Sequence, residues 1–224
     1  MHLASLTLPV GSEWLAVLIG YLLGSIPFGF VFARLKGVDL RAIGSGNIGA
    51  TNTGRALGKP LGFLAFFLDF AKGWFPAAVV AGWFLADGPA SVGNLSLAAL
   101  AGAAAVAGHV WPIYIGFKGG KAVATGCGVL VALDPTIFGL GGAVFLITAF
   151  STGFVSLASI IMGLSFPIIA WQVMGDEYGS EVVVYCVAFA ALVLWRHKDN
   201  LKRLTSGLEP RWRGRSKDGT WKQK

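Results

Sequence analysis

The sequence predicts an all-α polytopic membrane protein with seven transmembrane helices, two of them short and in the middle, an outside N-terminus and a cytoplasmic C-terminus. Composition is the first reason. The 224 residues are 55% hydrophobic and only 13% charged, whereas a soluble domain carries roughly 25% charged residues. The second reason is that long apolar stretches alternate with short polar breaks along the whole chain, as in a bundle of membrane-spanning helices.

The third reason is the distribution of charge. All but one of the 18 Lys and Arg residues fall at 34–59, at Lys118 and Lys121, or in the tail that begins at Arg196. Basic loops stay in the cytoplasm by the positive-inside rule, so these three segments are expected on the cytoplasmic side. They would meet anionic lipid headgroups first, which argues against nucleic-acid binding. The breaks between them carry only acidic charges: Glu13, Asp87, Asp134, Asp176, Glu177 and Glu181.

The first predicted span, Trp14 to Phe32, has nearly the length needed to cross a bilayer. Ser25-Ile26-Pro27 predicts a kink inside it, because proline removes a backbone hydrogen bond. The second span, Leu61 to Leu85, carries Asp69 and Lys72 three residues apart. Ionisable groups at that depth are costly unless they are paired, so an ion pair with an organising role is expected.

The third span, Leu95 to Val110, is rich in alanine and suited to close packing. The next segment, Ala122 to Leu133, is shorter than the ~20 residues that cross a bilayer. Asp134-Pro135 predicts a turn, after which an apolar run continues to Phe150. A re-entrant middle pair, which leaves five crossings, fits the same orientation. The last two spans are Phe154 to Met174 and Glu181 to Trp195.

The stretch Gly44 to Arg55, GSGNIGATNTGR, has the composition of an anion-binding loop. Its glycines let backbone N–H groups turn inward, and successive inward N–H groups form a concavity that favours an anion. Arg55 can add a two-pronged contact to phosphate. The stretch is not a P-loop, because GxxxxGK[ST] is absent. A flexible hydrophilic connector is the alternative interpretation.

The second polar segment, Gly108 to Lys121, ends in the sequence FKGGK. Lys118 and Lys121 flank a Gly-Gly pair that lets the backbone approach a ligand. Because the next span begins at Ala122, a phosphate there would meet ammonium charge together with a helix N-terminus. The alternative is that both lysines only orient the helix at the lipid interface.

The third polar segment begins at Arg196 and places His197 and Asn200 three residues apart, on one helical face. A histidine at the membrane surface can donate a hydrogen bond or act as a general base near neutral pH. Ser156 and Ser159, with the same spacing, can point into the bundle, although small polar residues also serve helix packing. A basic patch beside the membrane is the alternative for the third segment.

Other classes of site are missing from the sequence. There is no GxSxG nucleophile elbow and no His/carboxylate cluster with metal spacing. The sequence therefore predicts chemistry without metal or cofactor, and it shows no evident carboxylate base. His109, alone in an apolar run, is expected to be a structural hydrogen-bonding residue.

Three motifs in order resemble those of the bacterial acyl-phosphate-dependent glycerol-3-phosphate acyltransferases of the PlsY type, and the likeness covers nearly the whole chain. The first motif is GSIPFG at 24–29 with GSGNIGATNTGR at 44–55, and the second is GHVWPIYIGFKGGKAVAT at 108–125. The third combines VSLAS at 155–159 with RHKDNLKRLTSGLE at 196–209. The chain also lacks the HxxxxD signature that is usual in glycerolipid acyltransferases using acyl-CoA or acyl carrier protein.

The resemblance implies one integral-membrane acyltransferase domain over 1–224, with a basic cytoplasmic segment at 196–224, in the bacterial inner membrane. The implied reaction moves an acyl group from acyl-phosphate to the 1-hydroxyl of glycerol 3-phosphate on the cytoplasmic face. It yields lysophosphatidic acid and phosphate, the first step of phospholipid synthesis. The partners would be these two substrates and membrane lipids. The sequence does not fix the oligomeric state, and a monomer is compatible with it.

The resemblance also implies residue roles. Catalysis is expected from His197, Asn200, Ser45 and Ser156, with His197 or a substrate phosphate oxygen taking the proton. The acyl chain is expected between helices, reached from the bilayer, and the hydroxyl is expected to attack directly, without an acyl-enzyme. Substrate binding is expected from Gly46, Asn47, Thr51, Asn52, Arg55, Lys118, Lys121, Ser159 and Lys202.

Two other functions compete with the acyltransferase. A transporter for a phosphorylated metabolite would use the same basic elements, with Asp69 and Lys72 as an intramembrane switch. Against it, the polar groups gather on one face, and no inverted repeat is visible. A helical scaffold for lipid-synthesis partners would leave the loop chemistry unexplained.

Overall fold

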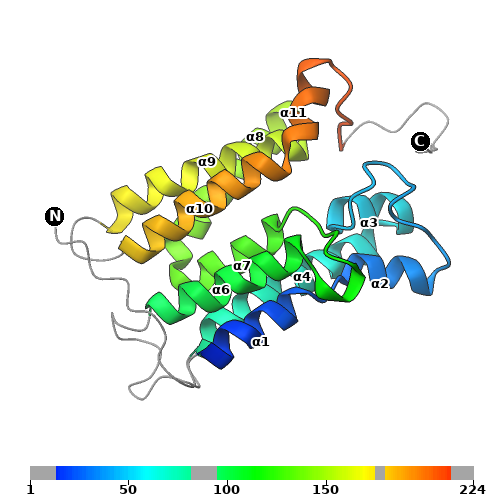
Figure 1. The fold of residues 1–224 in the computed structure, drawn as a ribbon. Coiled ribbons are helices and arrows are strands. Elements are labelled where there is room, and N and C mark those ends of the chain that lie inside the picture. The colour runs from blue at the N-terminus through cyan, green and yellow to red at the C-terminus, as the bar shows by residue number, and fades with distance from the viewer. Residues whose placement is uncertain (1–13, 82–94, 175–179, 213–224) are drawn as a thin grey trace.

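Residues 14–81, 95–174 and 180–212 are described by the computed structural model, and within these ranges the chain forms helices and no strands (Figure 1). One group of helices packs around α6 and α7, and a second group of α8, α9 and α10 covers it (Figure 1). The main helices are α1 (Trp14–Gly24), α4 (Lys59–Phe75), α6 (Leu95–Val110), α7 (Val123–Leu133), α8 (Pro135–Thr152), α9 (Val155–Met174) and α10 (Ser180–Arg196).

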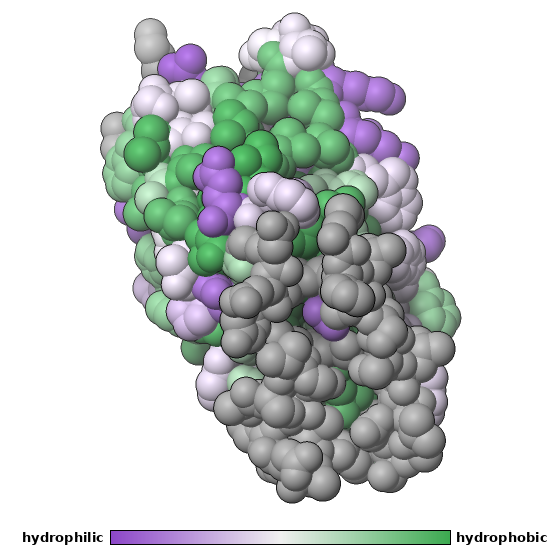
Figure 2. All heavy atoms as spheres, turned by 90° about the vertical axis from the view of Figure 1, so that its left-hand side faces the viewer, coloured by the Kyte–Doolittle hydropathy of each residue, from purple (hydrophilic) through white to green (hydrophobic). Residues whose placement is uncertain are grey.

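Five helical stretches in the described part of the chain are long and apolar enough to cross a membrane. Many large apolar side chains on them are exposed, and hydrophobic side chains form much of the described surface in Figure 2. An apolar exterior of this kind suits contact with lipid. The stretches are Trp14–Leu35, Lys59–Val80, Leu97–Ile115, Pro135–Thr152 and Val155–Met174.

The first span is kinked, as predicted. Helix α1 ends at Gly24 and α2 (Phe28–Leu35) begins directly after Pro27. The Ile26 carbonyl at the kink accepts a hydrogen bond from Lys72 Nζ at 2.7 Å. The predicted ion pair is also present, because Lys72 Nζ lies 2.7 Å from Asp69 Oδ1 and both side chains are buried. The pair therefore joins the second span to the kink of the first.

The predicted spans correspond to helices, with some differences in length. The second predicted span corresponds to α4, which begins at Lys59 instead of Leu61. Pro60 fits in its first turn, because the N–H that proline lacks is not needed there. The predicted end of this span at Leu85 lies outside the described residues. The prediction of two short central helices is half wrong. Helix α7 has 11 residues, but α8 has 18 and is long and apolar enough to cross a membrane. Asp134 caps the start of α8 by accepting from the N–H groups of Thr136 and Ile137.

Two short helices lie at the same end of the bundle, α3 (Ala50–Leu57) and α11 (Lys198–Thr205) (Figure 1). The sequence predicted a loop over Gly44 to Arg55, whereas its second half is helical. Helix α3 forms because it packs on α4, where Gly54 and Gly62 meet closely: a Cβ on Gly62 would lie 2.6 Å from the Gly54 Cα. Packing therefore overrides the poor helix propensity of Thr, Asn and Gly.

Candidate active site

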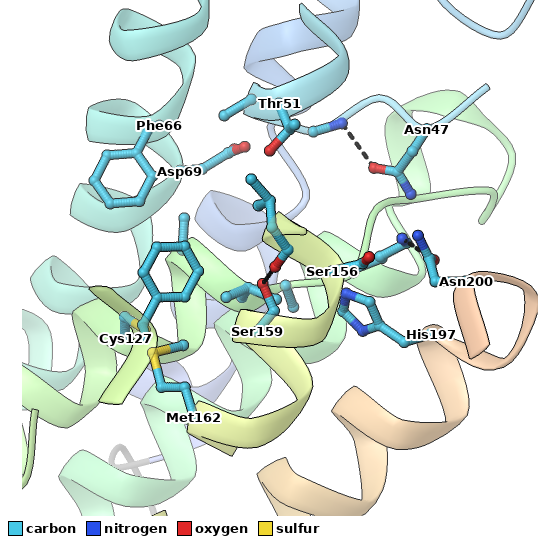
Figure 3. A pocket seen from close by; sticks show the side chains of 18 of the residues that line it. Asn47, Thr51, Phe66, Asp69, Cys127, Ser156, Ser159, Met162, His197 and Asn200 are labelled. Carbon is cyan, nitrogen blue, oxygen red and sulfur yellow. Dashed lines mark hydrogen bonds between the residues drawn. The ribbon is translucent and has the colours of Figure 1, made fainter. Parts of the chain in front are cut away.

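A cavity of about 610 Å³ connects the α3 and α11 end of the bundle with the space between α4, α7, α8 and α9. Figure 3 shows Asn47, Ser156, His197 and Asn200 on one side of it and Phe66 on the other. All three polar segments of the sequence contribute residues to this cavity. The polar lining is Ser45, Asn47, Thr51, Asn52, Arg55, Asp69, His109, Lys121, Ser156, Ser159, His197, Asn200 and Glu209.

Asn52 organises the Gly-rich loop. Its side chain is 2% exposed and donates from Nδ2 to the carbonyls of Leu40 (3.1 Å) and Ile43 (2.9 Å). Its Oδ1 accepts from the Ser45 N–H at 3.0 Å. Both amide hydrogens and the oxygen are therefore used inside the protein. Asn52 shapes the loop, and the expectation that it holds phosphate is not supported by these contacts.

The expected concavity of loop N–H groups is also wrong in its details. The N–H of Gly46 donates to the Ile43 carbonyl, that of Asn47 to Ser45 Oγ, and that of Gly49 to Asn47 Oδ1. These donors are already satisfied within the loop. The cavity is instead lined by Gly49, Ala50 and Thr51, the first turn of α3. The N–H groups and dipole of a helix start favour an anion, so the first turn of α3, and not the loop before it, is the candidate anion site.

The Gly-Gly pair of FKGGK has a different role from the predicted one. A Cβ on Gly119 would collide with the His109 carbonyl, and one on Gly120 would collide with the His109 ring. Arg196 donates to the carbonyls of Gly119 and Gly120, each at 3.0 Å. The glycines therefore let the loop pack against the bundle, and this packing fixes the position of Lys121.

Lys121 is the cation at the centre of the site. Its Nζ donates a hydrogen bond to Asn200 Oδ1, and its side chain lines the main cavity and the neighbouring one. Burial lowers the pKa of Lys121 to about 8, since a low-dielectric surrounding disfavours the charged form. Glu209 raises this pKa, whereas Arg203, Arg196 and Arg55 lower it.

Glu209 is a buried carboxylate that the sequence analysis missed. It accepts hydrogen bonds from Asn200 Nδ2 at 2.6 Å and from Arg203 Nε at 2.7 Å. Burial by itself would raise the pKa of Glu209, but the nearby Ser156 hydroxyl and the hydrogen bonds from Asn200 and Arg203 outweigh it and lower the pKa. The signal in the sequence was a single acidic residue at the end of the third motif. The sequence predicted no evident carboxylate base, and Glu209 does not contradict this, because an ionised, paired carboxylate with a lowered pKa is a weak base.

His197 is 2% exposed and immediately precedes α11. Its Nδ1 lies 2.8 Å from the Val193 carbonyl, which can only accept, so Nδ1 carries a hydrogen. Burial, together with the nearby Lys121, lowers the pKa of His197 to about 4. The imidazole is therefore neutral near pH 7 and keeps a lone pair on Nε2. This tautomer suits a hydrogen-bond acceptor, whereas a pKa of about 4 makes the imidazole of the free protein a weak general base.

The two serines on α9 differ in their bonding. Ser159 Oγ donates to the Val155 carbonyl of its own helix at 2.9 Å. Ser156 is buried and faces the Glu209 carboxylate, whose pKa it lowers, but its hydroxyl meets no partner at full hydrogen-bond geometry among the described residues. Ser156 is therefore the serine with bonding capacity left for a ligand.

Arg55, on α3, lines the main cavity beside Thr51. Burial lowers the pKa of its guanidinium, which Glu209 opposes. A second cavity of about 420 Å³ shares Ser45, Asn47, Lys121 and Asn200 with the first. Gly46 and the exposed Lys118 line only this second cavity. Lys202 is exposed on α11 and lines neither cavity, so the structure does not bring it to the site.

The other end of the main cavity is apolar and open to the side. Gly139 and Gly142 of α8 line it, and a Cβ on either would meet nothing within 4 Å. Leu146 of the same wall is half exposed. Further apolar lining comes from Phe66, Cys127, Phe138, Ala143, Phe145 and Met162. The arrangement can hold a polar headgroup at one end and a hydrocarbon chain at the other.

Asp69 and His109 also line the main cavity. His109 Nδ1 is 3.2 Å from Thr125 Oγ1 and 3.7 Å from Asp69 Oδ1. With Lys72, these groups form a buried polar cluster that joins α4, α6 and α7. The structural role expected for His109 agrees with this position.

Comparison with known proteins gives a consistent result. The family model described as "Glycerol-3-phosphate acyltransferase" matches residues 14–207. A glycerol-3-phosphate acyltransferase of Aquifex aeolicus is 44% identical over 196 residues, covering 88% of this chain and 97% of that protein. One of Desulfotalea psychrophila is 40% identical and covers 90% and 98%. A crystal structure of PlsY (YgiH), an integral membrane glycerol 3-phosphate acyltransferase in its glycerol 3-phosphate form, has a TM-score of 0.81 at 43% identity, covering 90% and 96%. Its lysophosphatidic acid form has a TM-score of 0.78 at 42% identity, covering 90% and 95%.

Proposed function

Because the chain belongs to the glycerol-3-phosphate acyltransferase family, we propose that its cavity transfers an acyl group from acyl-phosphate to the 1-hydroxyl of glycerol 3-phosphate. The products are lysophosphatidic acid and phosphate. One observation carries the proposal: a single cavity joins a cluster of cationic and hydroxyl groups to an apolar groove that opens toward lipid. An acyl donor and a phosphorylated acceptor need both ends at once.

The choice of acyl-phosphate as donor rests on charge. Its leaving group is phosphate, on which negative charge increases as the acyl–oxygen bond breaks. Lys121, Arg55 and the start of α3 converge on the polar end of the cavity and can stabilise that charge. The neighbouring cavity, which shares Lys121 and Asn200, adds Arg41, Arg196 and Arg203 and provides room for the phosphate of glycerol 3-phosphate.

The proposed chemistry is a direct displacement. The glycerol 1-hydroxyl attacks the acyl carbonyl carbon, a new ester bond forms, and the bond to phosphate breaks. The hydroxyl proton passes to Nε2 of neutral His197 or to an oxygen of the departing phosphate. Asn200, Ser45 and Ser156 hold the reacting groups, and positioning with charge stabilisation supplies most of the acceleration, since acyl-phosphate is already activated.

The proposed placement follows from the charge map. The chain forms one integral-membrane domain in the bacterial inner membrane. Its seven crossings are the five apolar stretches together with α7 and α10. The end with α3 and α11 is basic and faces the cytoplasm, so glycerol 3-phosphate arrives from the cytoplasm and the acyl donor from the bilayer.

The test uses purified protein in liposomes with glycerol 3-phosphate and either palmitoyl-phosphate or palmitoyl-CoA. Phosphate release and lysophosphatidate are followed together. We expect equal amounts of phosphate and lysophosphatidate with palmitoyl-phosphate as donor and neither product with palmitoyl-CoA. The Arg55→Ala variant is expected to lose this activity. Turnover with palmitoyl-CoA and none with palmitoyl-phosphate would refute the assignment of acyl-phosphate as the donor. An acyl-enzyme that forms and is consumed at the turnover rate in rapid-quench experiments would refute the direct displacement.

A further inference from the structure

The chain beyond α11 forms a strap, residues 206–212, that returns to the turn between α8 and α9. The Trp212 N–H donates to the Gly153 carbonyl at 2.9 Å, and its indole Nε1 donates to the Ala149 carbonyl at 3.2 Å. The indole ring packs edge-on against Phe150, with centroids 5.6 Å apart. The family match ends at residue 207, so this attachment lies beyond the matched residues.

Arg211 makes a second attachment beside Trp212. Its guanidinium carbon lies 5.0 Å from the centre of the Phe154 ring, within the range of a cation–π contact. Its side chain also lies over Gly153, where the left-handed backbone (φ +78°) ends α8. Arg211 and Trp212 together are called the clasp. It holds the far end of the strap, while Ser206 continues from α11 at the near end.

Between these two ends the strap inserts Glu209 into the cavity. An ionised carboxylate only accepts hydrogen bonds, so the side of Asn200 that faces Glu209 must be its NH₂ group. The amide oxygen of Asn200 is thereby turned to Lys121, whose Nζ donates to it. The position of Glu209 therefore sets the orientation of Asn200 and the direction of the Lys121 ammonium.

We propose that Arg211 and Trp212 are positioning residues for acyl transfer, which hold Glu209 in the cavity and through it orient Asn200 and Lys121. This inference rests on the proposed function. The simpler role for Trp212 is that of an interfacial anchor, as is common for tryptophan at membrane surfaces. Such an anchor directs its indole N–H to water or headgroups, whereas this one donates to a backbone carbonyl of α8.

The experiment compares full-length wild-type protein and Trp212→Ala in liposomes, with palmitoyl-phosphate and glycerol 3-phosphate as substrates. We expect kcat/KM to fall about tenfold, since a small displacement of catalytic groups costs this much or more. In a Glu209→Gln background the same change is expected to cost less than twofold, because residues that act through one another are not additive. Trp171→Ala, which removes an exposed tryptophan of α9, is the control and keeps wild-type activity.

The pH profile separates positioning from simple loss of stability. Lys121 is faced by Glu209 from the strap and by Arg203, Arg196 and Arg55 from α11, α10 and α3. If the clasp opens and Glu209 leaves, Lys121 loses the carboxylate that raises its pKa while Arg203, Arg196 and Arg55 still lower it, so the alkaline limb of kcat/KM moves to lower pH. An unfolding effect alone changes the amount of active enzyme but leaves the limb in place.

The outcomes are distinct. An active wild-type protein whose Trp212→Ala variant keeps its kcat/KM and pH profile would overturn the positioning role, and so would equal losses in the wild-type and Glu209→Gln backgrounds. If Trp212→Ala does not fold, Trp212→Phe and Arg211→Ala each weaken the clasp and are expected to show the same shift of the limb to a smaller extent. An inactive wild-type protein would instead remove the proposed function, and the positioning role with it.

Discussion

Replacing Lys121 with alanine tests the centre of the proposed site. The side chain lines both cavities and donates to Asn200. In the proposed complex Lys121 forms a charge pair with a substrate phosphate. Removing one member of such a buried, hydrogen-bonded charge pair costs about 2–5 kcal/mol, and 1.4 kcal/mol corresponds to a factor of ten. We therefore expect kcat/KM for glycerol 3-phosphate to fall at least about 30-fold in Lys121→Ala.

The assay is initial-rate phosphate release in liposomes at saturating palmitoyl-phosphate. Lys118→Ala, three residues away on the same loop but exposed, is expected to lose less than about threefold, because exposed charges contribute little. Lys59→Ala, exposed at the start of α4, is the neutral control. A Lys121→Ala variant that stays within threefold of the wild type, or losses equal to those of Lys118→Ala, would refute the assignment of Lys121 as the central phosphate-binding cation.

Three further predictions concern other parts of the protein. His197→Gln is expected to lower kcat about 100-fold or more with little change in KM if the imidazole takes the proton; an increase in KM alone would assign the proton to phosphate. Asp69→Asn or Lys72→Met alone is expected to destabilise the protein by about 3–5 kcal/mol in thermal or denaturant unfolding, and the double variant is expected to recover most of it. Gly142→Leu, which fills the open groove of α8, is expected to lower the turnover of palmitoyl-phosphate relative to that of a short-chain acyl-phosphate, and an unchanged ratio would place the acyl chain elsewhere.

Much of the fold follows from the sequence because the membrane restricts the choices. An apolar stretch in lipid must satisfy its own backbone, so it must be helical. Leu95–Val110 and the kink at Pro27 follow from this rule and from the missing N–H of proline. Helix α3 does not follow, because its residues are poor helix formers. Contact with α4, through Gly54 and Gly62, and the hydrogen bonds of Asn52 to the preceding loop stabilise it.

The candidate site, like the fold, was predicted from the sequence only in part. Residue types identified the groups that gather around the cavity, since an anion-binding site needs cations and neutral donors wherever the fold places them. They did not identify which donors remain available. Asn52 has the chemistry of a ligand-binding residue, yet it uses all its hydrogen-bonding groups on Leu40, Ile43 and Ser45. Glu209 was missed for the opposite reason: its position depends on the chain turning back after α11, which brings it onto Asn200.

The lowered pKa values of the site lead to a last prediction. Lys121 has a pKa of about 8 without substrate, because burial and the neighbouring arginines disfavour its charge. A bound phosphate supplies opposite charge at short range and raises that pKa. The profile of kcat/KM reports the free enzyme and that of kcat the substrate complex. The alkaline limb of kcat/KM is therefore expected near pH 8 and that of kcat at clearly higher pH. Coincident limbs would mean that Lys121 does not sense the substrate phosphate, and a limb of kcat below that of kcat/KM would reverse the sign of the argument.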